Sequence, residues 1–117
     1  MNTPAGLQIR EATEADLPGV LALYAQPGLD DGNVLSPEEA RAIWQQFARY
    51  PSYRLFVAHN AAGEMVGTYA LLVMHNLAHR GTPSAIAEDV VVSQVHQRQG
   101  LGRALMAHAL QQARDAG

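Results

Sequence analysis

A run of three valines, framed by two carboxylates and a pair of glycines, constrains the fold more than any other part of the chain. Glu88-Asp89 precede Val90-Val91-Val92 in a strand predicted over residues 84–93. A run that is apolar on both faces is typical of a strand covered on both sides, so we expect this strand at the centre of a sheet. Gly100-Leu101-Gly102 then opens a helix with an apolar stripe at Leu105, Met106, Ala109, Leu110 and Ala113.

The remaining segments predict one continuous α/β pattern. Strands are expected over 7–10, 53–59 and 65–74, and the five-residue connection 60–64 favours an antiparallel hairpin between the last two. A first helix follows Thr13 and Asp16, which stand at the spacing of a helix cap. Ser36-Pro37-Glu38-Glu39 places a cap, a proline and a returning glutamate at the start of a second helix.

Composition excludes several classes of protein. The 117 residues have the size of one domain, and a formal charge of -3 provides no basic field for nucleic acid or an anionic membrane. Without cysteine the chain has no disulfide, no thiolate zinc site and no cysteine nucleophile. The apolar stretches are far shorter than the roughly 20 residues that cross a bilayer, and the N-terminus lacks a signal-like run. We therefore expect a cytoplasmic protein.

The glycine pair predicts an anion-binding site. The first amides of a helix have no partner within it and carry the positive end of the helix dipole, so they attract phosphate. Gly100 and Gly102 let a ligand approach the backbone, while Arg98 and Arg103 can add charge at the rim. The alternative is that both glycines serve only the turn. The pattern matches neither G-x-x-x-x-G-K-[ST] nor G-x-G-x-x-G, which disfavours nucleoside triphosphatases and dinucleotide enzymes.

Gln97-x-x-Gly100-x-Gly102 resembles the R/Q-x-x-G-x-G/A signature of the GCN5-related N-acetyltransferases, and the element order from Leu7 onward is similar too. The resemblance implies an α/β (α+β) fold, with a mixed, mostly antiparallel sheet flanked by helices, over a single domain 1–117. It implies acetyl-CoA as the donor. It also implies a pyrophosphate held by amides of 99–103 and a pantetheine arm held by Val90 and Val92. The predicted donor site comprises Val90, Val91, Val92, Gln97, Arg98, Gln99, Gly100, Leu101, Gly102 and Arg103.

Acetyl transfer to an amine needs a base, because only the neutral amine attacks a thioester. Glu88 is the first candidate, just upstream of the expected amide donors. Strand alternation predicts that Asp89 points to the opposite face. Because small-amine members of the family have a similar Glu-Asp pair that binds substrate, either residue suits that role. The alternative is an ordinary charged pair at a strand edge.

Further polar residues are candidates for the acceptor pocket. His75, Asn76 and His79 precede the valine strand, and Asp30 and Asp31 lie in the loop that caps the acceptor in the resembled family. An ordinary solvated loop is the alternative in both places. No third ligand accompanies the two histidines, so we expect no metal site. We expect surface positions for His59, His96 and His108, and core positions for Tyr24, Trp44 and Tyr69.

The resembled fold continues past the signature helix with a strand, a helix and a final strand, which this chain lacks. We therefore expect a truncated fold, either a fragment or a chain completed by a homodimeric or strand-donating partner. The leading function is acetyl transfer to a small primary amine. The alternatives are a non-catalytic acetyl-CoA-binding module and a protein or peptide N-acetyltransferase.

Overall fold

The computed structural model describes residues 4–28, 30 and 32–116. Within these residues, four antiparallel strands form one sheet in the order β1-β2-β3-β4. The strands are β1 (Gln8–Glu11), β2 (Tyr53–His59), β3 (Met65–Met74) and β4 (Ser84–Val92). The α-helices are α1 (Leu17–Tyr24), α2 (Pro37–Gln46) and α3 (Leu101–Asp115), with 3-10 turns at Glu14–Asp16, Phe47–Arg49, His79–Gly81 and Gln94–His96. The mixed fold and the hairpin predicted from the sequence are confirmed.

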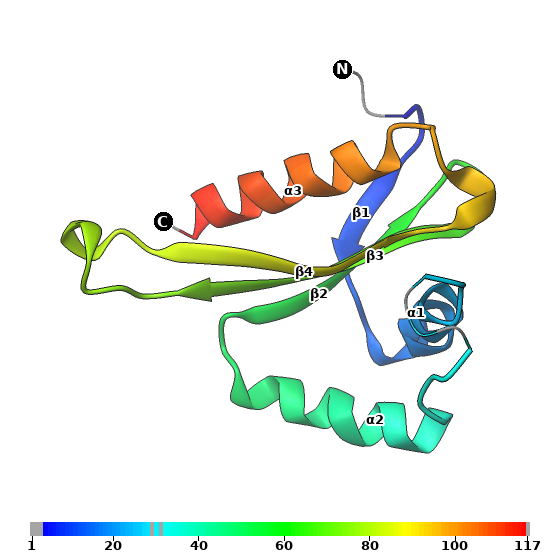
Figure 1. Cartoon of the computed structure of the whole chain (residues 1–117), viewed down its shortest axis with the longest axis horizontal. Helices are drawn as coiled ribbons and strands as arrows, with labels where there is room; N and C mark the ends of the chain where they lie inside the picture. Colours follow the sequence, from blue (N-terminus) through cyan, green and yellow to red (C-terminus); the bar gives the residue numbers. More distant parts are fainter. Residues whose placement is uncertain (1–3, 29, 31, 117) are drawn as a thin grey trace.

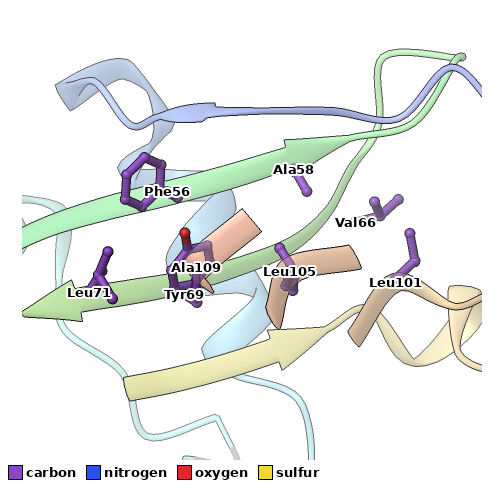
Figure 2. Close-up of a cluster of buried hydrophobic side chains, with 8 residues drawn as sticks. All are labelled: Phe56, Ala58, Val66, Tyr69, Leu71, Leu101, Leu105 and Ala109. Carbon is purple, nitrogen blue, oxygen red and sulfur yellow. The ribbon is translucent and has the colours of Figure 1, made fainter. Parts of the chain in front are cut away.

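Helices cover both faces of the sheet, with α3 on one side and α1 and α2 on the other (Figure 1). Figure 2 shows the cluster under α3, formed by Phe56, Ala58, Val66, Tyr69, Leu71, Leu101, Leu105 and Ala109. The cluster on the opposite face contains Ala12, Val20, Leu55, Val57 and Ala70, with Tyr24, Trp44 and Phe47 packed against it. Apolar side chains alternating along β2 and β3 thus supply both cores.

The second helix begins where its capping residues predict. The Ser36 hydroxyl accepts a hydrogen bond from the Glu39 amide at 3.2 Å, and the Glu39 carboxylate accepts one from the Ser36 amide at 2.9 Å. Two backbone donors of the segment are thus satisfied locally, and Pro37 occupies the first helical position without losing a bond. The cap fixes where α2 starts on its face of the sheet.

The apolar run predicted that the valine strand lies at the centre of the sheet, and this prediction is wrong. Among the described residues β4 pairs only with β3 and forms the edge. Val91 is buried, whereas Val90 is 40% exposed and Ile86 44% exposed. The run indicated correctly that β4 has apolar residues on both sides, but within the described chain nothing pairs with its outer edge. That edge leaves backbone groups of β4 open to a ligand or another strand.

All three histidines expected at the surface, His59, His96 and His108, are partly buried. His108 Nδ1 lies 2.7 Å from the hydroxyl of Tyr69, whose residue is fully buried under α3. Burial, and secondarily the charge of Arg54, lower the pKa of His108, while burial raises the pKa of Tyr69 to about 12. His96 is partly buried, with its ring 3.6 Å from Glu64. Apolar periodicity places Tyr69 in the core correctly, but it does not reveal its polar partner.

An ion pair joins β1 to the turn that starts α1. Both guanidinium nitrogens of Arg10 donate to the Asp16 carboxylate, at 2.7 and 2.8 Å, and the Thr13 amide donates to the same carboxylate at 2.7 Å. The Asp16 side chain is only 9% exposed. The hydrogen bonds from Arg10, more than those from Thr13, hold the pKa of Asp16 well below its ordinary value. The ionised form is therefore favoured by folding.

We predict that Asp16→Asn lowers the free energy of unfolding at neutral pH by about 1 to 2 kcal/mol, because a capping carboxylate and an ion-pair partner are lost. The folded pKa is depressed, so the stabilisation is complete above the ordinary pKa of 3.8 and is lost as the pH falls below it. Urea denaturation across pH measures both effects. Glu14→Gln, which changes an exposed carboxylate of the same turn, is the control. A deficit that persists unchanged in acid would contradict this account.

Candidate active site

A bulge in β4 shapes the acidic side of the site. Thr68 of β3 pairs with Val91 and Ala70 pairs with Glu88, so Asp89 and Val90 together stand opposite the single residue Tyr69. Asp89 has φ 52, in the left-handed region that aspartate tolerates better than most residues. A bulge of this kind re-aims the side chains that follow it and interrupts alternation.

The bulge brings both carboxylates to the same face, contrary to the predicted alternation. Glu88 is in register with Ala70, which belongs to the core beneath α1 and α2, and Asp89 lines a pocket on that same side. Burial raises the pKa of Tyr53, and the charges of Glu88 and Asp89 raise it further. The two carboxylates therefore act on the same region. The prediction was wrong because alternation assumes one residue of β4 opposite each residue of β3, whereas the bulge places two residues of β4 opposite one.

The pocket beside Asp89 has a volume of about 250 Å³ and lies between the sheet and helices α1 and α2. Its wall is apolar and aromatic except for Asp89 and two tyrosine hydroxyls, with Tyr24, Leu35, Ile43, Trp44, Phe47, Tyr53 and Leu55 among the lining residues. Burial, then the charges of Asp89 and of Asp30, raise the pKa of Tyr24. Negative potential at this pocket disfavours a tyrosinate and, by the same sign, favours a bound cation.

The glycine pair predicted to bind phosphate lies beyond the C-terminal end of β4. After Val92 the chain passes through the turn Gln94–His96 and reaches Gly100, the cap of α3, with φ 79. The Ala104 amide donates to the Gly100 carbonyl at 3.0 Å and closes the first helical turn. The amides at the start of a helix precede the first such bond, as those of Leu101 and Gly102 do here. These residues line one hollow together with Arg98, which has φ 69 in the preceding loop.

The hollow has a volume of about 570 Å³ and is lined by Val92, Gln97, Arg98, Gly100, Leu101, Gly102 and Arg103. A Cβ added at Gly102 would meet no atom within 4 Å outside its own turn of helix. Gly102 is helical and needs no positive φ, so nothing in the described fold requires glycine there. Glycine costs stability in a helix, and open space in front of it is the geometry of close approach by a ligand. The residues present thus fit an extended phosphate-bearing ligand.

Other predicted residues lie apart from this arrangement. His75 lines a separate hollow with Arg54, Gln112 and Asp115, near the end of α3. Asn76 donates to the Thr82 carbonyl at 2.9 Å and holds the hairpin between β3 and β4, in which His79 also lies. That hairpin projects away from the glycine loop (Figure 1). The structure does not bring these three residues to Glu88 and Asp89.

Asp30 is placed nearer to the acidic pocket. Its backbone amide donates to the Tyr24 carbonyl at 3.1 Å, and its charge contributes to the raised pKa of Tyr24. Asp31, the other acidic candidate of this loop, lies outside the described residues. In the described part of the chain no group of three or more histidine, aspartate or glutamate side chains could hold a metal ion. Among the same residues no helix has the length and apolarity to cross a membrane.

Sequence reasoning missed Gln26. Its side chain donates to the carbonyls of Leu23 and Val92, at 3.0 and 3.2 Å, and accepts from the Gln94 amide at 2.7 Å. Gln26 therefore joins the end of α1 to the end of β4, across 66 positions of sequence. A glutamine in a loop rich in glycine and proline carries no signal of such a contact, because its partners are backbone groups brought close only by the fold.

The family comparison agrees with this geometry. The model of the acetyltransferase (GNAT) family matches residues 17–117, and the chain belongs to that family. A search of curated proteins finds no match.

Solved structures share the fold over nearly the whole chain. A protein from Agrobacterium tumefaciens C58, described as a candidate acetyltransferase, is 33% identical with a TM-score of 0.81, over 93% of this chain and 74% of its own. An acetyltransferase from Trypanosoma brucei is 28% identical with a TM-score of 0.79, over 95% and 77%. A transcriptional regulator from Bacillus halodurans C-125 is 26% identical with a TM-score of 0.85, over 95% and 76%.

We predict opposite effects of alanine at the two glycines on the stability of the ligand-free protein. Gly102→Ala raises the free energy of unfolding by about 0.5 kcal/mol, because alanine is the better helix former and open space receives the methyl group. Gly100→Ala lowers it by about 1 to 2 kcal/mol, because φ 79 strains any residue with a Cβ. Urea denaturation without ligand measures both. If Gly102→Ala were destabilising, the glycine would have a role in the fold itself.

Proposed function

We propose that the protein transfers the acetyl group of acetyl-CoA to a primary amine of a small molecule. The observation that carries the proposal is Gly102, which sits in the family signature and faces open space. Nothing in the described fold requires a glycine there, whereas close approach of a pyrophosphate does. Membership of the acetyltransferase family makes acetyl-CoA the donor that fits this cradle.

In this proposal the amides of Gln99, Gly100, Leu101, Gly102 and Arg103 hold the pyrophosphate, and Gln97 and Arg98 line the hollow. The open edge of β4 receives the pantetheine arm. The Ser93 amide donates to the Val66 carbonyl at 2.8 Å, so alternation turns the amide of Val92 to the outer edge, and Val90 lies in the bulge just before it. Val91 packs inward and keeps that edge in place. An outward amide at this edge is also suited to stabilise the oxyanion formed from the thioester carbonyl.

Glu88 and Asp89 supply the acceptor chemistry. Negative potential at the pocket attracts an ammonium group but also favours its protonated form, so a base must remove a proton before attack. We assign Glu88 as that base, directly or through one water, and Asp89 as the group that binds the amine, with Asp30 adding charge. The amine nitrogen then bonds to the acetyl carbon and loses its second proton to solvent, the carbon–sulfur bond breaks, and coenzyme A leaves as a thiolate that solvent protonates. His75, Asn76 and His79 remain candidates only for a larger acceptor that reaches the hairpin.

The pocket also favours an acceptor with an apolar body. Its wall is formed by aliphatic and aromatic side chains of α1, α2 and β2, and among the residues that the structure describes Asp89 is the one carboxylate that lines it. A pocket of this composition gains free energy from apolar surface and uses its few polar groups for orientation. An arylalkylamine such as phenethylamine therefore suits the pocket better than an aminosugar with many hydroxyl groups.

Measuring the release of free thiol from acetyl-CoA distinguishes two other functions from this one. A non-catalytic module would bind acetyl-CoA and release no free thiol when amines are added. A protein or peptide N-acetyltransferase would use a peptide with a free N-terminus in preference to phenethylamine. The pocket of about 250 Å³ beside Asp89 favours a small amine over a peptide. Completion by a second copy or a strand-donating partner is compatible with the open edge of β4 and is tested by measuring the mass in solution.

We predict that acetyl-CoA binds saturably in calorimetric titration and that Gly102→Val weakens binding at least about 30-fold, because a branched side chain fills the space before the helix amides. Ala107→Val is the matched control, since it places the same branched side chain on the exposed side of α3. Equal affinity of the wild-type protein and Gly102→Val would remove the cradle from the proposal.

We predict a kinetic split between the two carboxylates, with phenethylamine as acceptor and thiol release as the readout. Glu88→Gln lowers kcat by about 10²-fold or more with little change in KM, because a general base is lost. Asp89→Asn raises the KM for the amine by about tenfold with a smaller effect on kcat, because an ionic contact to the substrate is lost.

Glu11→Gln is the control for both variants, since Glu11 ends β1, which forms the opposite edge of the sheet from β4. Its kinetic constants should match those of the wild-type protein. A Glu88→Gln variant with unchanged kcat would show that the pair is an ordinary charged feature of the strand.

A further inference from the structure

We propose that Gln26 is a positioning residue that fixes the donor loop, residues 93–100, against the acceptor helix α1. The inference rests on the proposed function, since it assigns the two ends of the contact to donor and acceptor. Gln26 follows α1 and is partly buried, and its amide group makes three hydrogen bonds. A fourth bond runs from the Gln94 side chain to the Pro27 carbonyl at 3.1 Å.

The partners of Gln26 lie at the point where β4 ends and the loop begins. Val92 presents its carbonyl on the outer edge, where no described strand pairs with it, and Gln26 donates to that carbonyl. The Gln94 amide follows that of Ser93, which still bonds to β3, and the side-chain carbonyl of Gln26 accepts from the Gln94 amide. The side chain of Gln26 thus bonds to the Val92 carbonyl and the Gln94 amide as a neighbouring strand would. It sets the direction in which the chain leaves β4 toward Gly100.

The same side chain is fixed to the acceptor side. Its bond to the Leu23 carbonyl closes the end of α1, and Tyr24, in the same turn, lines the pocket beside Asp89. A displacement of α1 by a bound amine therefore shifts Gln26, and with it the carbonyl of Val92 and the amide of Gln94. Coupling of this kind is reciprocal, so a bound donor also orders the acceptor side.

The hydrogen bonds of Gln26 position the loop more than they stabilise the fold. Gln94 is exposed, so water replaces the bond to its amide when Gln26 is removed, and little stability is lost. What is lost is the fixed geometry of the loop, and an unordered loop must be ordered at the expense of donor affinity. A purely structural role would show the opposite balance, with lower stability and unchanged affinity of the folded protein.

The test compares Gln26→Leu, which keeps the size of the side chain and removes its hydrogen bonds, with Gln45→Leu, an exposed glutamine of α2. Acetyl-CoA is titrated calorimetrically at a temperature where every variant is folded. We expect Gln26→Leu to weaken binding about tenfold and Gln45→Leu to leave it unchanged. Gln94→Ala, which removes only the bond to Pro27, should weaken it about two- to threefold and serves also if Gln26→Leu does not fold.

Hydrogen exchange of the backbone amides provides a readout that does not require the donor. Without ligand, Gln26→Leu should raise the exchange rate of the Gln94 amide and of the loop that follows, while the α3 amides past the first turn stay protected. Wild-type affinity in Gln26→Leu would overturn the inference, as would unchanged exchange at Gln94. If the wild-type protein does not bind acetyl-CoA, the proposed function fails, and the exchange rates alone decide whether Gln26 holds the loop.

Discussion

The bulge at Asp89 is the local feature on which the acidic side of the site depends. It places two residues of β4 opposite Tyr69, and so brings consecutive carboxylates to one face of a strand that would otherwise separate them. The bulge needs a left-handed residue, and Asp89 provides it at φ 52. Tyr69 opposite it is fully buried and bonded to His108 of α3, which fixes the partner strand where the bulge occurs.

The donor and acceptor regions occupy different ends of the same short segment. Residues 88–92 carry the carboxylates and the open edge, and residues 97–103 carry the cradle. The strand orients residues 88–92, and the helix cap orients residues 97–103. The loop between them therefore sets how the two groups are placed relative to each other. Gln26 is the side chain that joins this loop to α1, which makes the end of α1 part of the site although no motif identifies it.

The sequence predicts the regular elements well because their signals are local. The bounds of β2 and β3 and the Ser36 cap of α2 follow from alternation, turn residues and capping residues close together in the chain. The start of α3 at the glycine pair was predictable for the same reason, since the signal and the helix are adjacent in the chain. The facing of Asp89, the edge position of β4 and the role of Gln26 were not, because each depends on pairing or contact between distant segments.

Several places where local rules are broken lie in the segment assigned to function, although His79 and Arg80 also have positive φ, in the β3–β4 hairpin. Asp89 and Arg98 adopt left-handed conformations, and Gly102 weakens the helix it opens. Each of these lowers stability, since a residue with a Cβ resists positive φ and glycine disfavours a helix. The framework offsets them elsewhere, through the Arg10–Asp16 pair, the double cap of α2 and the two cores. A chain under selection for stability alone would replace Gly102 with alanine, so the glycine is best explained by what must approach the backbone in front of it.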